Sequence, residues 1–212
     1  MMPLQNRVQP NGEILALSGH GRFMGNRGIL HSDNKSLSHI RWRHKAWVTC
    51  LLSFKGRKRP LMAPKAYTEL FFLDEATAMA AGHRPCGYCR RADYLRFVDA
   101  WAEHAGTRPK APQMDKALHA ARIVPRTRKQ LRHQAPLRDL PEGAMILRDG
   151  TAYLLLQDAV LPYRRAHYGP PQRRSRTETV TVLTPVPMLN VLRAGFIPAL
   201  HASADLSVTA SD

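Results

Sequence analysis

The sequence predicts a single α+β domain, and three observations support this. The chain has 212 residues, 44% of them hydrophobic, which is enough for one core of good size. Short segments rich in β-branched and aromatic residues, separated by glycine and proline turns, recur in the first and last thirds. Two segments between them repeat apolar residues every three or four positions, as helices do. We expect a β-rich N-terminal half with helices and a tight turn that carries two cysteines, the cysteine knuckle (residues 85–89), followed by a C-terminal β-hairpin unit.

The first third is predicted to be mostly strands and turns. Residues 1–12 are expected to be a loose lead-in, and residues 13–17 a short strand. Residues 19–28 contain four glycines in ten positions, which indicates backbone turns or a close approach of the backbone to another group. Their spacing fits neither a Walker loop nor a dinucleotide fingerprint. Residues 40–54 are interpreted as a β-hairpin or two strands turning near residues 44–45, and residues 67–73 as a further strand.

Helices are expected next. Asp74 is a suitable N-cap for a short helix that runs to residue 81, and Gly82 is suited to the position after its end. Apolar residues at helical spacing predict a second helix over residues 90–105. Pro109 and Pro112 are expected to interrupt the chain. A third helix is predicted over residues 113–124, stopped or kinked by the following proline.

The last third is predicted to be rich in strands. Asp149-Gly150 is a strong hairpin signal between strands at residues 145–148 and 151–156. Further strands are expected at residues 160–164 and 177–184, with a loop at 168–176 and a final helix at 185–194. The composition changes near residues 106–112. We therefore divide the chain into regions 1–106 and 107–212, which we expect to pack as one domain.

The charge of the chain is unusual. It carries 32 lysines and arginines against 16 acidic residues, a formal net charge of +16 and a pI near 10.6. Such an excess favours nucleic acid as the partner, and an anionic membrane surface second. A membrane partner is disfavoured because no strongly amphipathic helix carries the charge and no apolar run approaches spanning length. Compositional drift towards arginine is the alternative explanation. An odd number of cysteines and the lack of a signal-peptide pattern predict a cytoplasmic protein.

The segment Pro85-Cys86-Gly87-Tyr88-Cys89 is the most informative of the chain. Two cysteines separated by two residues can direct both sulfurs at one metal ion, and zinc is the expected cofactor. Neighbouring arginines favour thiolate and would also suit a phosphate backbone. By charge and position alone, we expect the following residues to bind nucleic acid: Arg57, Lys58, Arg84, Arg90, Arg91, Arg126, Arg128 and Lys129.

A third sulfur is available from Cys50, 36 residues before Cys86 at the end of a predicted strand. Taken alone, Cys50 is interpreted as a small buried hydrophobic residue. Taken together with the knuckle, it is a candidate third metal ligand. His31 is the expected fourth ligand, with His83 as an alternative, and Glu69 is a candidate base or ligand. An open metal position that holds water or substrate, or no metal at all, are the other options.

Two segments resemble a known family. FFLDEATAMAAGHRPCGYCRR, residues 71–91, and WVTCLLSF, residues 47–54, are similar to the metal-binding domain of the Ada DNA-alkylation-response protein. The resemblance covers about residues 42–91. It implies a zinc–thiolate site in which Cys50 is both a zinc ligand and the acceptor of a methyl group from alkylated DNA phosphate. The family's second cysteine falls on Phe54, so this sequence departs from the pattern there.

The sequence thus predicts a DNA-binding protein with a zinc–thiolate site, in which Cys50 is the candidate catalytic residue, and the resemblance implies DNA damage sensing or repair. A metal-dependent hydrolase acting on nucleic acid, nuclease or glycosylase-like, is one alternative. A structural-zinc binding module is another. A zinc deaminase is disfavoured because the chain lacks the upstream His-x-Glu that supplies the proton shuttle. A thioredoxin-like redox site is disfavoured because the knuckle follows a short helix.

Overall fold

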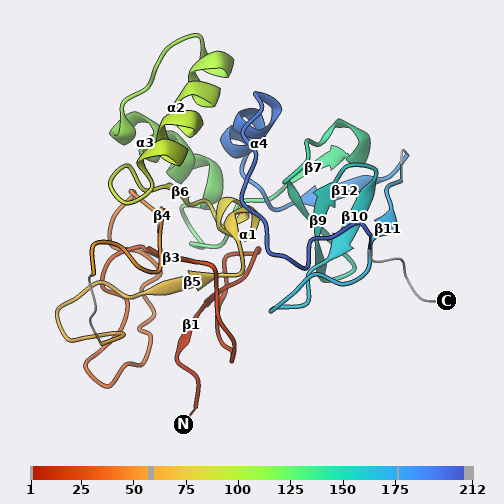
Figure 1. The fold of residues 1–212 in the computed structure, drawn as a ribbon. Coiled ribbons are helices and arrows are strands. Elements are labelled where there is room, and N and C mark those ends of the chain that lie inside the picture. Colours follow the sequence, from red (N-terminus) through yellow and green to blue (C-terminus); the bar gives the residue numbers. More distant parts are fainter. Residues whose placement is uncertain (1, 57–59, 176, 208–212) are drawn as a thin grey trace.

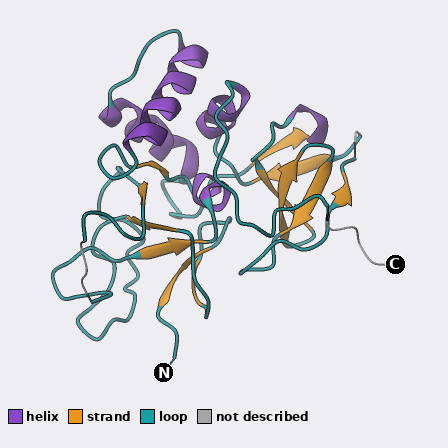
Figure 2. Ribbon diagram, in the orientation of Figure 1, coloured by secondary structure: helices purple, strands orange, loops and turns teal. Residues whose placement is uncertain are grey.

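The computed structural model describes residues 2–56, 60–175 and 177–207 and confirms the α+β class (Figure 1). In this part of the chain two six-stranded sheets lie on either side of a group of helices (Figure 2). The first sheet comprises β1 (Gln5–Val8), β2 (Ile14–Ala16), β3 (Phe23–Asn26), β4 (Val48–Cys50), β5 (Leu70–Phe72) and β6 (Arg84–Pro85). The second comprises β7 (His133–Pro136), β8 (Met145–Arg148), β9 (Thr151–Leu156), β10 (Ala159–Pro162), β11 (Gln172–Arg173) and β12 (Thr179–Val182). The helices are α1 (Glu75–Ala80), α2 (Arg91–Ala105), α3 (Ala111–Arg122), α4 (Val186–Arg193) and the 3₁₀ turn η1 (Leu137–Asp139).

The first sheet has the strand order β2-β1-β5-β3-β4-β6. β4 runs antiparallel to β3 and parallel to the edge strand β6, with Val48 opposite Arg84 and Thr49 opposite Pro85. The next residue along each of these two strands is a cysteine, Cys50 on one and Cys86 on the other. The β4–β6 pairing therefore brings together two sulfurs that are far apart in the sequence.

Helix α1 joins the first sheet to the knuckle and begins as predicted. The Asp74 side chain accepts a hydrogen bond from the Thr77 backbone N–H at 2.9 Å, the N-cap contact that satisfies a free amide of the first turn. Gly82 follows the helix with φ of +80°, a conformation that glycine adopts without strain. All six residues of the helix are buried, so α1 is a fixed support for the strand that follows.

Helices α2 and α3 form, and α3 begins two residues before the prediction. Pro112 lies in the first turn of α3, where its missing N–H would have no partner within the helix, and the proline therefore starts the helix instead of breaking the chain. Gly106 ends α2 in the left-handed conformation, with φ of +71°.

The second sheet confirms the predicted hairpin. β8 and β9 pair antiparallel around Asp149 and Gly150, both of which have positive φ, as a tight two-residue turn requires. Helix α4 ends just before Gly195, whose φ is also positive. The predicted loop at 168–176 contains the short strand β11, which pairs with β10.

Two predictions for the first sheet were wrong, and a third was incomplete. The expected lead-in contains β1, which pairs with β2 and β5. The glycine-rich segment contains the unpredicted strand β3, and the close approach expected there is present: a Cβ at Gly25 would be 2.4 Å from the Val48 carbonyl oxygen. Residues 40–47 form no strand; the Trp47 indole donates to the His44 carbonyl at 2.9 Å, a local contact that holds this segment as a loop.

The largest hydrophobic core cluster contains residues from both the 1–106 and the 107–212 regions. Phe97 of α2 and Leu118 of α3 belong to the same buried cluster as Ile146 and Val182 of the second sheet and Leu189 of α4. The helices therefore bury one face against the second sheet while α1 and β6 connect them to the first. Within the described ranges, no helix combines the length and apolar character needed to cross a bilayer.

Candidate metal centre

The three cysteines of the chain converge on one site. The sulfurs of Cys50, Cys86 and Cys89 all lie within 4.8 Å of one another. The Cys86 backbone N–H donates to the Thr49 carbonyl at 2.9 Å, which extends the β4–β6 pairing to the first residue of the knuckle. The Arg90 N–H then donates to the Cys86 carbonyl at 3.1 Å and closes the turn that leads into α2. The predicted grouping of Cys50 with the knuckle is therefore present in the structure.

Backbone amides are directed at two of the sulfurs. The Tyr88 N–H lies 3.5 Å from the Cys86 sulfur, and the Leu51 backbone also hydrogen-bonds to Cys89. Hydrogen bonds of this kind stabilise a sulfur that carries negative charge. The peptide conformation around the knuckle thus favours thiolates, the form in which cysteine binds metals.

The three thiols do not ionise equally in the metal-free protein. A hydrogen bond from the Cys50 thiol lowers the pKa of Cys86, and this effect exceeds the opposing effect of burial. The same hydrogen bond, followed by burial, raises the pKa of Cys50. Burial raises the pKa of Cys89. The pKa of Cys86 is thus lowered while the pKa values of Cys50 and Cys89 are raised, and a bound cation would supply the positive charge needed for all three sulfurs to ionise together.

The cysteine site opens into a cavity of about 730 Å³. Its walls are mainly apolar, and Leu51, Leu52 and Phe54 all contribute to them. Phe54 packs edge-on against Tyr88, with ring centroids 5.1 Å apart. The residue that stands where the Ada pattern has a second cysteine is thus part of an aromatic wall beside the three sulfurs.

Glu69 is an acidic group on the wall of this cavity. It is 2% exposed, and its Oε2 accepts a hydrogen bond from the Met62 backbone N–H at 2.8 Å. Its carboxylate is not among the atoms that group within 4.8 Å of the sulfurs in the described part of the chain. Glu69 therefore lines the cavity without joining the three cysteines.

Neither histidine proposed as a fourth ligand joins the cysteine group among the described residues. The His31 ring nitrogens contact the Thr68 hydroxyl at 2.6 Å and the Ala63 carbonyl at 3.2 Å. His83 is fully buried, and its Nε2 accepts a hydrogen bond from the Arg27 side chain. Burial, followed by nearby arginines, holds the pKa of His83 well below its ordinary value.

Two arginines expected to bind phosphate are instead buried in ion pairs. Arg84 makes two hydrogen bonds of 2.8 Å to the Asp115 carboxylate of α3. Arg90 pairs with Glu75 at 2.7 Å and with Asp93 at 2.8 Å. Both arginines are almost inaccessible to solvent, so neither can reach a nucleic-acid backbone without breaking these pairs. The prediction for Arg84 and Arg90 is wrong because α1, α2 and α3 place carboxylates beside them, a pairing that charge and position in the sequence do not show.

The remaining predicted phosphate ligands lie elsewhere. Arg91 is exposed beside the knuckle, with its guanidinium over the Tyr94 ring. Arg126, Arg128 and Lys129 are exposed after the end of α3. Arg57 and Lys58 lie outside the described residues.

A comparison with protein-family models, curated proteins and solved structures finds no significant match to this chain.

Proposed function

We propose that the protein binds zinc through Cys50, Cys86 and Cys89 and acts on DNA at this centre. The observation that carries the proposal is the convergence of three sulfurs from β4 and the knuckle within 4.8 Å. Zinc favours tetrahedral sites built from thiolates, and two cysteines separated by two residues are a common half of such a site. The backbone hydrogen bonds to the sulfurs of Cys86 and Cys89 support the same assignment.

Three protein ligands leave one position of a tetrahedral ion open. Closed structural zinc sites have four protein ligands, whereas reactive sites keep a position for water or substrate. The cavity of about 730 Å³ beside the sulfurs is the space in which a reacting group would lie. These features favour a reactive centre over a structural-zinc module.

The resemblance to the Ada domain supplies the reaction that we propose. The Cys50 thiolate attacks the methyl carbon of a methylated DNA phosphate, a new sulfur–carbon bond forms, and the oxygen–carbon bond breaks. The bonding electrons stay on the phosphate oxygen, so the negative charge of the thiolate is passed to a restored phosphodiester. Cys50 lines the cavity and is only partly buried, which leaves its sulfur accessible from that side. The net charge of +16 supports a polyanionic partner.

Elemental analysis of the purified full chain tests the metal assignment. We expect about one zinc per chain after reconstitution under reducing conditions, and loss of the metal in the Cys86→Ser and Cys89→Ser variants. The Leu52→Ala variant is a matched control, because Leu52 lines the same cavity without offering a ligand. A wild-type chain without zinc, or full zinc content in both serine variants, would contradict the assignment.

Methylated DNA tests the reaction. Incubation with a methyl phosphotriester oligonucleotide should add the mass of one CH₂ to the peptide that contains Cys50, and the transfer should stop after one event per chain. The Cys50→Ser variant should lose the transfer and keep DNA binding. Equal transfer in that variant would exclude Cys50 as the acceptor.

A metal-dependent hydrolase is the second candidate, because Glu69 lies on the cavity wall where it can serve as a base. Turnover separates the two functions. A hydrolase converts many equivalents of DNA per chain and gains no mass on Cys50, whereas an acceptor is consumed by a single reaction.

A further inference from the structure

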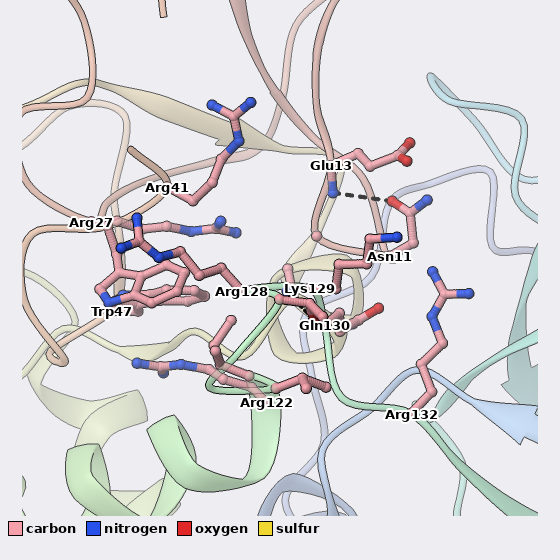
Figure 3. Close-up of a pocket in the computed structure, with 16 residues that line it drawn as sticks. Asn11, Glu13, Arg27, Arg41, Trp47, Arg122, Arg128, Lys129, Gln130 and Arg132 are labelled. Atoms are coloured by element: carbon pink, nitrogen blue, oxygen red, sulfur yellow. Dashed lines mark hydrogen bonds between the residues drawn. The ribbon is translucent and has the colours of Figure 1, made fainter. Parts of the chain in front are cut away.

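A second cavity, of about 560 Å³, lies apart from the cysteines (Figure 3). It is formed by the turn before β2, the end of β3, the loop before β4 and the segment that follows α3. None of the three cysteines lines it. Its volume falls in the range of sites that hold small organic ligands.

The walls of this cavity are strongly basic. Among the described residues, Glu13 is the one acidic side chain in the lining. Figure 3 shows Arg27, Arg41 and Arg128 gathered near Trp47, with Arg132 on the other side of the space towards Asn11. In the part of the chain that the structure describes, six cationic residues line the cavity: Arg27, Arg41, Arg122, Arg128, Lys129 and Arg132.

Two of these arginines are buried, and both lie over the ring of Trp47. The Arg27 guanidinium is 4.0 Å and that of Arg122 is 3.8 Å from the ring centroid. Arg27 is 2% exposed and Arg122 1% exposed. Among the residues that the structure describes, neither forms an ion pair with a carboxylate.

The hydrogen bonds of these two arginines are also incomplete. Arg122 donates to the Gly82 and Lys45 carbonyls, each at 2.6 Å, and Arg27 donates to His83 at 3.2 Å. The Arg122 Nε and the Arg27 Nη2 have no hydrogen-bond partner within the described part of the chain.

Positive charge at this place is costly without an anion. Burial, followed by the neighbouring charge of Arg41, lowers the pKa of Arg27 to about 9. Burial, followed by the charge of Arg27, lowers the pKa of Arg122 to about 8. Buried cations are normally compensated by a paired anion, and no carboxylate of the described chain forms an ion pair with either arginine, although the charge of Asp115 offsets part of the cost for Arg122. A ligand that brings negative charge into the cavity would relieve this cost.

We propose that this cavity binds the phosphate group of a nucleotide. Guanidinium groups match the geometry of phosphate oxygens, and the exposed Arg41, Arg128 and Lys129 would contact the phosphate from the cavity rim. The buried Arg27 and Arg122 supply a positive field behind them.

An aromatic wall indicates a nucleotide rather than phosphate alone. Trp42 lines the cavity, is only partly buried, and is held by an edge contact to His119 with ring centroids 5.4 Å apart. Its ring is available to a stacked base. The nucleotide can be free or part of a strand; the strand form rests on the DNA binding proposed above, whereas the phosphate site does not.

Tryptophan fluorescence of the full chain tests the site, because two of the three tryptophans line the cavity. Deoxyadenosine 5′-monophosphate should quench it saturably, inorganic phosphate should compete, and deoxyadenosine should bind much more weakly. The Arg41→Gln/Arg128→Gln variant should bind the nucleotide at least about tenfold more weakly, since two charge-assisted hydrogen bonds are lost.

The matched control is the Arg138→Gln/Arg173→Gln variant, which removes the same charge at exposed positions outside the cavity. It should bind the nucleotide within about twofold of wild type, as expected for charges screened by salt. Equal binding of nucleotide and nucleoside, or an equal loss in both double variants, would overturn the proposal.

Two further measurements separate this site from the metal centre and identify the source of the phosphate. The Cys86→Ser variant should keep nucleotide binding, and loss of binding there would show that the cavity does not act by itself. An oligonucleotide should bind the Arg41→Gln/Arg128→Gln variant more weakly than wild type if the ligand is part of a strand. Unchanged oligonucleotide binding beside weakened nucleotide binding would overturn the strand form.

Discussion

Replacing Asp115 with asparagine should strongly destabilise the protein. Asp115 pairs with Arg84 through two hydrogen bonds of 2.8 Å, and the two side chains are 9% and 6% exposed. Removing one partner of a buried ion pair leaves an uncompensated charge, which costs about 3–5 kcal/mol. Asp115 also raises the pKa of Arg122, so the substitution removes a favourable interaction with a second buried cation.

Thermal and urea unfolding measure this effect. For a chain of this length, a loss of about 3–5 kcal/mol lowers the melting temperature by roughly 6–20 °C. The Asp99→Asn variant is the control, because Asp99 pairs with Arg108 on the surface, where both side chains are more than half exposed. That substitution should cost less than about 1 kcal/mol.

The outcome also decides the role of Arg84. If it is structural, Arg84→Gln should destabilise the fold as Asp115→Asn does, and the DNA affinity of the folded protein should not fall selectively. The reasoning would be refuted if Asp115→Asn cost no more than Asp99→Asn while Arg84→Gln weakened DNA binding at unchanged stability. Arg84 would then be a phosphate ligand after all.

Two further predictions concern residues around Arg122. Gly82→Ala should lower the free energy of unfolding by more than Gly195→Ala. Both glycines have positive φ, which costs about 1 kcal/mol for alanine. A Cβ at Gly82 would also lie 2.4 Å from the Arg122 side chain, whereas nothing lies within 4 Å of a Cβ at Gly195. Equal losses of unfolding free energy in the two variants, measured by urea denaturation, would show that crowding by Arg122 adds no cost at Gly82. Stability should also fall as the pH drops below about 6.5, because the pKa of His83 is lowered in the folded state and the unfolded state then binds the extra proton. His83 should contribute a slope of about 1.4 kcal/mol of unfolding free energy per pH unit, from about pH 6.5 down to its folded pKa. The His83→Gln variant should therefore show a flatter dependence of stability on pH, and an unchanged dependence would exclude His83 as the cause.

Local signals in the sequence predicted local structure well. The N-cap at Asp74, the turn at Asp149-Gly150 and the helix end before Gly195 all depend on a few neighbouring residues, and all three are present. The strands of the first sheet were harder to predict, since β1 and β3 have four residues each and exist through pairing with β5, far along the chain.

The same distinction applies to the candidate site. The knuckle is visible in the sequence because both cysteines lie within four residues, whereas the approach of Cys50 depends on the pairing of β4 with β6. Charge was the least informative signal. The sequence shows that Arg84 and Arg90 flank the cysteines, but the carboxylates that form ion pairs with them come from α1, α2 and α3.

The two proposed sites are joined by one pair of strands. Trp47, whose ring contacts both buried arginines, immediately precedes β4, and Cys50 ends that strand. His83, which contacts the Trp47 ring at 5.2 Å between centroids, immediately precedes β6, and Cys86 follows it. Three residues of extended chain span about 10 Å. The register that sets Cys50 beside Cys86 is therefore held at its other end by the packing of Trp47, so truncating that indole should loosen the sulfur cluster as well as the basic cavity.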